Sequence, residues 1–152
     1  MKMSKKKKEQ DHFSELVREI SRDEKTLRMK EYVQHGKVNT YDHCYAVAKT
    51  SYRLGKMLHL RFRERELVRG AFLHDYYLYD WHHYEGRWPG LTHPGMAADH
   101  AGRDFQLSSV ERDIIESHMW PLTIRKIPRS TEAALVCAAD KLCSLRETLF
   151  DR

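Results

Sequence analysis

The sequence lacks any apolar run long enough to cross a membrane, and residues 1–10 contain no hydrophobic signal segment. It also lacks an internal repeat and a linker rich in proline or serine, so residues 11–152 are expected to form a single domain. Only three cysteines are present, Cys44, Cys137 and Cys143, without CxxC spacing or the framework of a disulfide scaffold. These absences favour a soluble cytoplasmic protein with no membrane partner.

Positive charge is abundant only at the start of the chain. Four consecutive lysines, Lys5 to Lys8, account for most of the net charge of +5, and removing them leaves +1. A domain that binds nucleic acid specifically would need basic residues over one folded face, so no such binding is expected. Residues 1–10 are interpreted as a disordered basic tail, which could touch nucleic acid or another anionic partner.

The rest of the chain shows helical periodicity, since apolar residues recur every three or four positions. No segment alternates as a strand, so we predict an all-α fold: a compact bundle of six to seven helices. Gly36 suits the end of the second helix, and Ser108 with Glu111 forms a capping box for the sixth. The expected helices cover about residues 13–20, 23–35, 40–58, 63–77, 93–105, 108–118 and 130–150.

A scatter of histidines and carboxylates on these helices is the main functional signal. It comprises His43, His74, Asp75, His93, His118 and Asp140. Asp140 follows the apolar run from Val136 to Ala139, where an unpaired carboxylate would be costly to bury. Imidazole and carboxylate groups are suitable ligands for divalent transition metals, so the six residues are either unrelated or one metal site in the core of the bundle.

The order of these residues resembles the H…HD…D signature of the HD-domain superfamily of metal-dependent phosphohydrolases. The resemblance rests on Thr40-Tyr41-Asp42-His43-Cys44, Ala71-Phe72-Leu73-His74-Asp75 and Ala138-Ala139-Asp140-Lys141-Leu142, and it covers roughly residues 36 to 149. Leu91-Thr92-His93-Pro94-Gly95 and Ile115-Glu116-Ser117-His118 resemble the two extra histidines of dinuclear members. It implies one ion held by His43, His74, Asp75 and Asp140, and a second held by His93 and His118 with Asp75 bridging.

Two departures narrow the resemblance. Asp75 is followed by Tyr76-Tyr77-Leu78 rather than Gly-Lys, and His118 by Met119 rather than a second histidine. Both differ from the HD-GYP cyclic-dinucleotide phosphodiesterases. The pattern is closer to small dinuclear HD enzymes, such as the diadenosine tetraphosphate hydrolases, or to di-iron HD oxygenases.

The resemblance implies hydrolysis of a phosphate ester or anhydride by a metal-bound hydroxide, with two ions drawn from Fe, Mn, Co, Ni or Zn. Two divalent ions and two carboxylates leave the site with a positive charge, which suits a small phosphorylated substrate such as a nucleotide. Asp75, His74 and Lys141 are the expected catalytic residues, and Lys141, Trp88 and Arg125 the expected substrate-binding residues. A di-iron oxygenase and a non-catalytic nucleotide-binding HD module remain alternatives. Apolar faces of the first helices could support a homodimer.

Overall fold

The computed structural model describes residues 2–76 and 89–151, and for residues 89–93 it describes only the backbone. Seven α-helices, one turn of 3₁₀-helix at Arg28–Glu31 and one short hairpin make up this part of the chain, which confirms the predicted all-α class. The helices are α1 (Lys5–Arg22), α2 (Glu24–Leu27), α3 (Thr40–Met57), α4 (Glu64–Leu73), α5 (Pro89–Asp104), α6 (Ser109–Ser117) and α7 (Thr131–Phe150), and the strands are β1 (Val33–His35) and β2 (Val38–Asn39).

Side-chain caps fix where the helices around the histidines begin. The Asn39 side chain accepts a hydrogen bond from the Asp42 amide at 2.8 Å, at the start of α3. The Ser108 hydroxyl accepts from the Glu111 amide at 3.1 Å, which is one half of the predicted capping box, while the Glu111 carboxylate accepts from Arg69. Ser130 caps α7 in the same way. Each cap satisfies a backbone N–H that the helix itself cannot pair.

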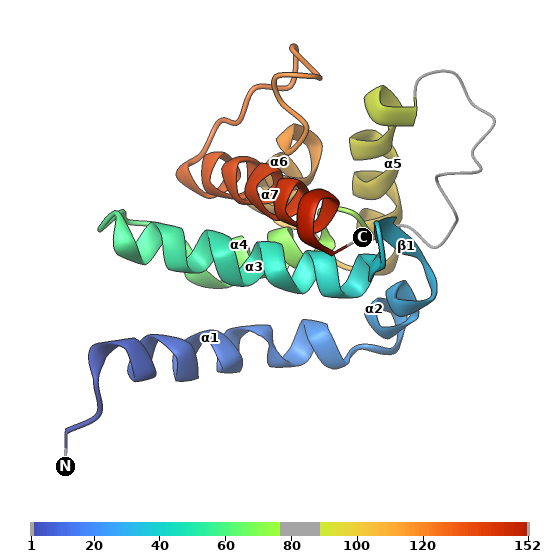
Figure 1. The fold of residues 1–152 in the computed structure, drawn as a ribbon. Coiled ribbons are helices and arrows are strands. Elements are labelled where there is room, and N and C mark those ends of the chain that lie inside the picture. The colour runs from blue at the N-terminus through green and yellow to red at the C-terminus, as the bar shows by residue number, and fades with distance from the viewer. Residues whose placement is uncertain (1, 77–88, 152) are drawn as a thin grey trace.

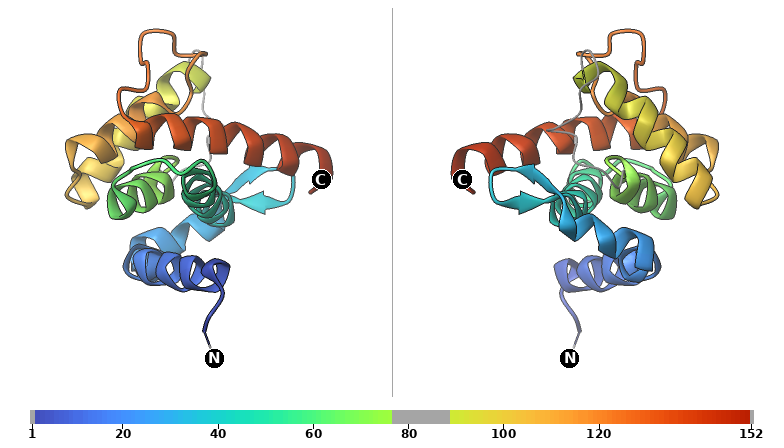
Figure 2. Two further views of the ribbon diagram at one scale, coloured as in Figure 1. Left: turned by 90° about the vertical axis from the view of Figure 1, so that its left-hand side faces the viewer. Right: turned by 90° about the vertical axis from the view of Figure 1, so that its right-hand side faces the viewer.

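Helix α3 lies at the centre of the molecule. α7 packs along one side of α3, α1 lies on the opposite side, and α4 runs beside α3 (Figures 1 and 2). Helix α6 packs on both α4 and α7, and α5 packs on α6. The buried face of α3 includes Cys44, Val47 and Ala48, none of which exposes any surface. The hydrophobic core therefore lies where α3, α4, α6 and α7 meet, and this is the region that holds the histidines.

The predicted second helix over residues 23–35 is wrong beyond its first turns. Helix α2 ends at Leu27, and after the 3₁₀ turn the chain forms the antiparallel hairpin of β1 and β2, with Val33 opposite Asn39. Gly36 has a φ of 55° and occupies the turn of this hairpin rather than the end of a helix. The Lys37 amide donates to the carbonyl of Asp151 at 3.0 Å. Contacts remote in sequence thus decide the conformation of this segment.

The expected disordered tail over residues 1–10 is also corrected. Residues 5–10 form the first turns of α1, with the Ser4 hydroxyl accepting from the Lys7 amide at 3.2 Å. Lysine is a good helix former, and the helix is anchored further on by Phe13, Val17 and Ile20, which are buried. Because these apolar residues face inward, α1 lacks the exposed apolar face proposed for a homodimer.

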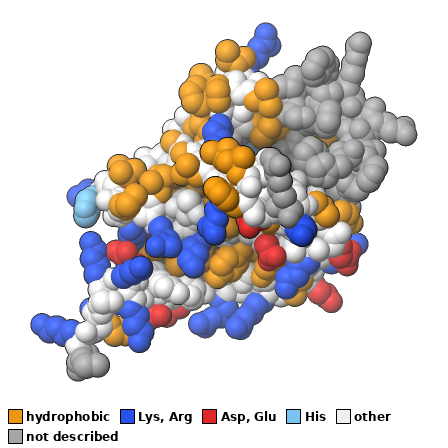
Figure 3. All heavy atoms as spheres, viewed as in Figure 1, with side chains coloured by type: hydrophobic (Ala, Val, Ile, Leu, Met, Phe, Trp, Pro, Cys, Tyr) orange, Lys and Arg blue, Asp and Glu red, His pale blue; other side chains and the backbone are white. Residues whose placement is uncertain are grey.

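Exposed apolar residues gather instead on the C-terminal half of α7. Leu142, Leu145 and Leu149 are each more than half exposed, although the periodicity predicts the first two as inward positions. Figure 3 shows apolar side chains over this helix on the face that it displays. The homodimer stays a prediction. In the ranges that the structure covers, none of the helices has both the length and the apolarity needed to span a bilayer.

Candidate metal centre

Four buried residues from three segments meet in the core. His43 lies in the first turns of α3, His74 and Asp75 directly follow α4, and Asp140 lies in the middle of α7. Their ligand atoms all lie within 4.8 Å of one another. The Nε2 atom of His43 is 3.0 Å from Asp140 Oδ1, and Nε2 of His74 is 3.3 Å from the same oxygen. The fold therefore brings together the four residues predicted to hold one ion.

Asp75 lies between this quartet and His118. Its Oδ2 atom is 3.3 Å from His43 Nε2 and 3.1 Å from His74 Nε2. Its other oxygen, Oδ1, is 3.3 Å from Nε2 of His118, which follows the end of α6. The two oxygens of one carboxylate thus contact different sets of imidazoles. This is the arrangement expected of a carboxylate that bridges two ions.

The second ring nitrogen of each histidine is held from outside the cluster. His74 Nδ1 donates to the Ala71 carbonyl at 2.6 Å, and His118 Nδ1 donates to the Ile115 carbonyl at 2.7 Å. His43 Nδ1 is 2.7 Å from Glu147 Oε2. A carbonyl or carboxylate oxygen can only accept here, so Nδ1 carries a proton in all three rings. Every Nε2 atom then faces the aspartates, where it donates a proton or, in the neutral ring, offers its lone pair to a cation.

The protonation of the cluster follows from its buried negative charges. Burial lowers the pKa of His43, but hydrogen bonds with Asp140, Asp75 and Glu147 outweigh it and hold the pKa well above its usual value. Burial also lowers the pKa of His74, but the negative charge of the adjacent Asp75 and hydrogen bonds with Asp140 and Asp75 raise it well above its usual value. For His118 burial dominates and lowers the pKa, although Asp75 opposes the shift. Despite burial, hydrogen bonds with His43 and His74 lower the pKa of Asp140.

These residues fit a divalent cation. Ionised carboxylates in a dry interior need a compensating positive charge, and here the imidazoles of His43 and His74 lie within 3.3 Å of Asp140, with the Ser144 hydroxyl at 3.4 Å. Protons on His43 and His74 supply that charge, and a metal ion can take their place because it binds the same nitrogen and oxygen atoms. The mixed nitrogen and oxygen donor set suits transition metals such as zinc, iron and manganese. Binding of an ion by these residues stays a prediction.

Three further residues around the cluster escaped the sequence reasoning. The Gln34 amide on β1 donates to Asp75 Oδ2 at 2.7 Å, and the Glu147 carboxylate holds His43. His35, for which the sequence predicts no role, packs its ring edge-on against that of His43 with the centroids 5.3 Å apart, and it joins His43 and Glu147 in a second group of potential ligands. One signal was available for Glu147, because a position seven residues after Asp140 lies on the same face of a helix. No local signal marks Gln34 or His35.

Four predicted site residues remain: His93, Trp88, Lys141 and Arg125. The backbone of His93 belongs to α5, but its side chain and the whole of Trp88 lie outside the described residues. The Lys141 ammonium group donates to the carbonyls of His118 at 3.2 Å and Cys137 at 3.5 Å. Arg125 lies in the loop between α6 and α7 and lines a cavity of about 400 Å³ against α6. The roles assigned to these four residues stay predictions.

The pattern that defines the HD domain matches residues 40–145, more than two thirds of the chain. The chain belongs to the HD-domain family. No curated protein and no solved structure matches it. The recognition made from the sequence is therefore confirmed, and with it membership of a superfamily whose members are mostly metal-dependent phosphohydrolases.

The ends of the range matched to the HD domain separate the predicted ligands from two residues that contact them. It begins at Thr40, the first residue of α3, and ends at Leu145, so it includes the quartet and both extra histidines. It leaves out Gln34 and Glu147, which contact the quartet from the two sides of the matched range. Part of the outer support of this HD-domain site therefore comes from beyond the matched range, whereas the carbonyls that hold His74 and His118 lie inside it.

Proposed function

We propose that this HD-domain protein hydrolyses a phosphate ester or anhydride of a nucleotide or another small phosphorylated metabolite, using two divalent ions. The observation that carries the proposal is the position of Asp75. One oxygen of this buried carboxylate lies near His43 and His74, and the other lies near His118. A centre that binds a single ion would need only the oxygen near His43 and His74.

Divalent ions bound in this way supply Lewis-acid polarisation of a phosphoryl oxygen and make a water molecule more acidic. The protein's own contribution is to hold the donors in place. His43, His74 and Asp140 would hold the first ion, Asp75 would contribute to both, and His118 with His93 would hold the second. Because each ring is fixed through Nδ1, the donor atoms need little rearrangement on binding.

The Lys141 ammonium group offers a charge for the substrate. It donates to the backbone carbonyl of His118, the first residue after α6, whose ring contacts Asp75 Oδ1. We infer that it neutralises a phosphoryl oxygen of the substrate. Trp88 is proposed to stack on a planar group such as a nucleobase, and Arg125 to contact a more distant anionic group.

The test is phosphate release from a panel of nucleotides and phosphorylated metabolites, with the protein loaded separately with Mn, Fe, Co, Ni or Zn. Asp75→Ala is the blank, and Asp11→Ala, which removes an exposed carboxylate from α1, is the matched control. We expect activity in the wild type and in the control and a loss of at least about 10³-fold in the blank. The reaction is run with and without oxygen.

Phosphate release that is equal under both atmospheres supports the proposal. Turnover that requires oxygen and iron, without phosphate release, would replace it with an oxygenase function. A purified protein that binds none of these metals and releases no phosphate from any substrate would leave a non-catalytic HD module.

A further inference from the structure

A cavity of about 210 Å³ lies between α1 and α3, and it shares no residue with the metal centre. Helix α1 contributes Lys6, Glu9, Gln10 and Phe13 to its lining, and α3 contributes Lys49, Tyr52 and Arg53. These positions recur at helical spacing, so each helix directs one face towards the cavity. The two aromatic rings are buried, with centroids 5.6 Å apart, and form an apolar base.

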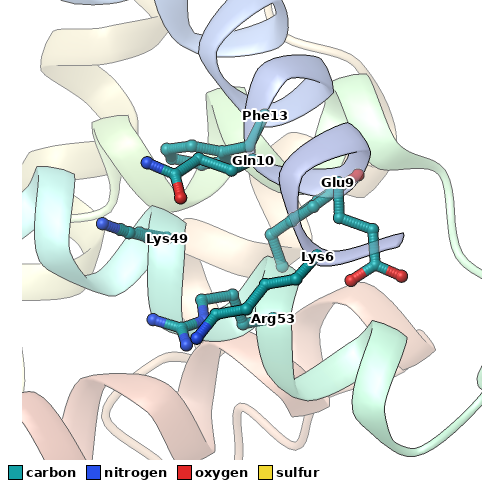
Figure 4. A pocket seen from close by; sticks show the side chains of 7 residues that line it. Lys6, Glu9, Gln10, Phe13, Lys49 and Arg53 are labelled. Atoms are coloured by element: carbon teal, nitrogen blue, oxygen red, sulfur yellow. The ribbon is translucent and has the colours of Figure 1, made fainter. Parts of the chain in front are cut away.

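The rim of this cavity carries an uncompensated positive charge. Lys49 and Arg53 lie one turn apart on α3, a spacing at which like charges repel. Figure 4 shows the side chains of Arg53 and Lys6 directed to the same side of the cavity, whereas the Glu9 carboxylate is directed to the other side. Glu9 instead lies 4.0 Å from Lys5.

No carboxylate of the residues placed in the structure lies within 4.0 Å of the charged groups of Lys6, Lys49 or Arg53. The neighbouring Lys56 shows that this is not a general property of α3, because Lys56 pairs with Glu64. Three cations that share a small space without a counter-ion are arranged for an anion from solution.

We propose that this cavity binds a diphosphate group, which inorganic pyrophosphate carries on its own and an organic ester carries as part of a larger molecule. The cations come from both helices, so a ligand with charges on more than one phosphoryl group can contact Lys6 on α1 and Lys49 and Arg53 on α3 together. The Gln10 amide is available as a further donor. The volume is below that of ordinary drug-sized pockets, which restricts the part of the ligand that enters. Bound there, the ligand would join the N-terminal turns of α1 to α3.

The test is calorimetric titration of the full chain with inorganic pyrophosphate, repeated on matched variants. Lys49→Gln/Arg53→Gln removes two cavity charges, and Arg18→Gln/Arg146→Gln removes two exposed helical charges elsewhere. We expect the cavity variant to raise the Kd by about 100-fold, since each lost charge-assisted hydrogen bond costs about tenfold, and the control to change it less than about twofold. Lys6→Gln should raise the Kd by about tenfold, which shows that α1 takes part.

A further variant shows whether pyrophosphate binds in this cavity or at the metal centre. Asp75→Ala should retain the binding that Lys49→Gln/Arg53→Gln removes. In amide spectra, pyrophosphate should shift resonances near residues 6–13 and 49–53. The proposal is overturned if the wild type does not bind pyrophosphate, if the cavity variant binds as the wild type does, or if only an oligonucleotide binds.

Discussion

Glu147 gives the sharpest test of how the fold prepares the metal centre. Its Oε2 atom is 2.7 Å from His43 Nδ1, and its side chain is only 6% exposed. The carboxylate fixes which nitrogen of His43 carries the proton and makes the other nitrogen a better donor to a cation. Removing it should therefore weaken metal binding although Glu147 is not itself one of the predicted ligands.

The expected loss of metal affinity depends on two properties of Glu147: its negative charge and its hydrogen-bond acceptor. Glu147→Gln can still accept a hydrogen bond from Nδ1 through its amide oxygen, but it loses the negative charge, so metal affinity should fall by about tenfold. Glu147→Ala loses both the charge and the acceptor and leaves the ring free to turn. Its metal affinity should fall by about 100-fold, which corresponds to about 2.7 kcal/mol.

The assay is competition with a fluorescent chelator for Zn²⁺ or Mn²⁺, which reports affinity without any need for activity. Glu132→Gln is the matched control, because Glu132 is another buried carboxylate of α7 and accepts from the Arg63 amide at 2.6 Å. It should lower the free energy of unfolding and leave metal affinity within about twofold of the wild type.

Metal affinity that is unchanged in both Glu147 variants would refute the orienting role. A result in which Glu132→Gln weakens metal binding as much as Glu147→Ala would mean that global stability, not the orientation of His43, determines the affinity.

Three further predictions concern the support of the site and the stability of the domain. Gln34→Ala removes the amide that donates to Asp75 and should weaken metal affinity by about tenfold in the same competition assay. Arg69→Ala leaves the buried Glu111 carboxylate without its Arg69 partner and should lower the free energy of unfolding by about 2 kcal/mol in a urea titration. This is less than the roughly 3–5 kcal/mol usual for breaking a buried ion pair, because burial already raises the pKa of Glu111 and favours its neutral form. Arg65→Ala, at an exposed position, should cost less than about 0.5 kcal/mol in the same titration. A metal ion at about 100 times its Kd should raise the melting temperature by about 5–10 °C and EDTA should reverse the rise, whereas a melting temperature insensitive to every divalent ion would contradict the site.

The sequence predicted the helices best where their ends depend on neighbouring residues. Ser108 and Ser130 cap α6 and α7 by accepting hydrogen bonds from the amides three residues further along the chain. Neighbouring residues are therefore enough to predict where these helices begin. The segment before α3 was predicted wrongly for the opposite reason. Its hairpin is joined to Asp151 at the end of α7 and to Asp75 after α4, and no window of neighbouring residues contains those contacts.

The same distinction explains what could be read of the site. His43, the His74-Asp75 pair and Asp140 were found because their residue types and order are characteristic of the family, and because a carboxylate in an apolar run is costly without a partner. Leu142 and Leu145 were placed inward by their periodicity, yet the face of α7 that turns inward beside Asp140 carries Cys143 and Glu147. Asp140 and Glu147 therefore determine which face of α7 is buried, against the periodicity of the leucines. They can be buried because His43 contacts both carboxylates across the helix interface. The hydrophobic pattern determines which helices pack, and the buried charges determine how α7 is rotated against α3.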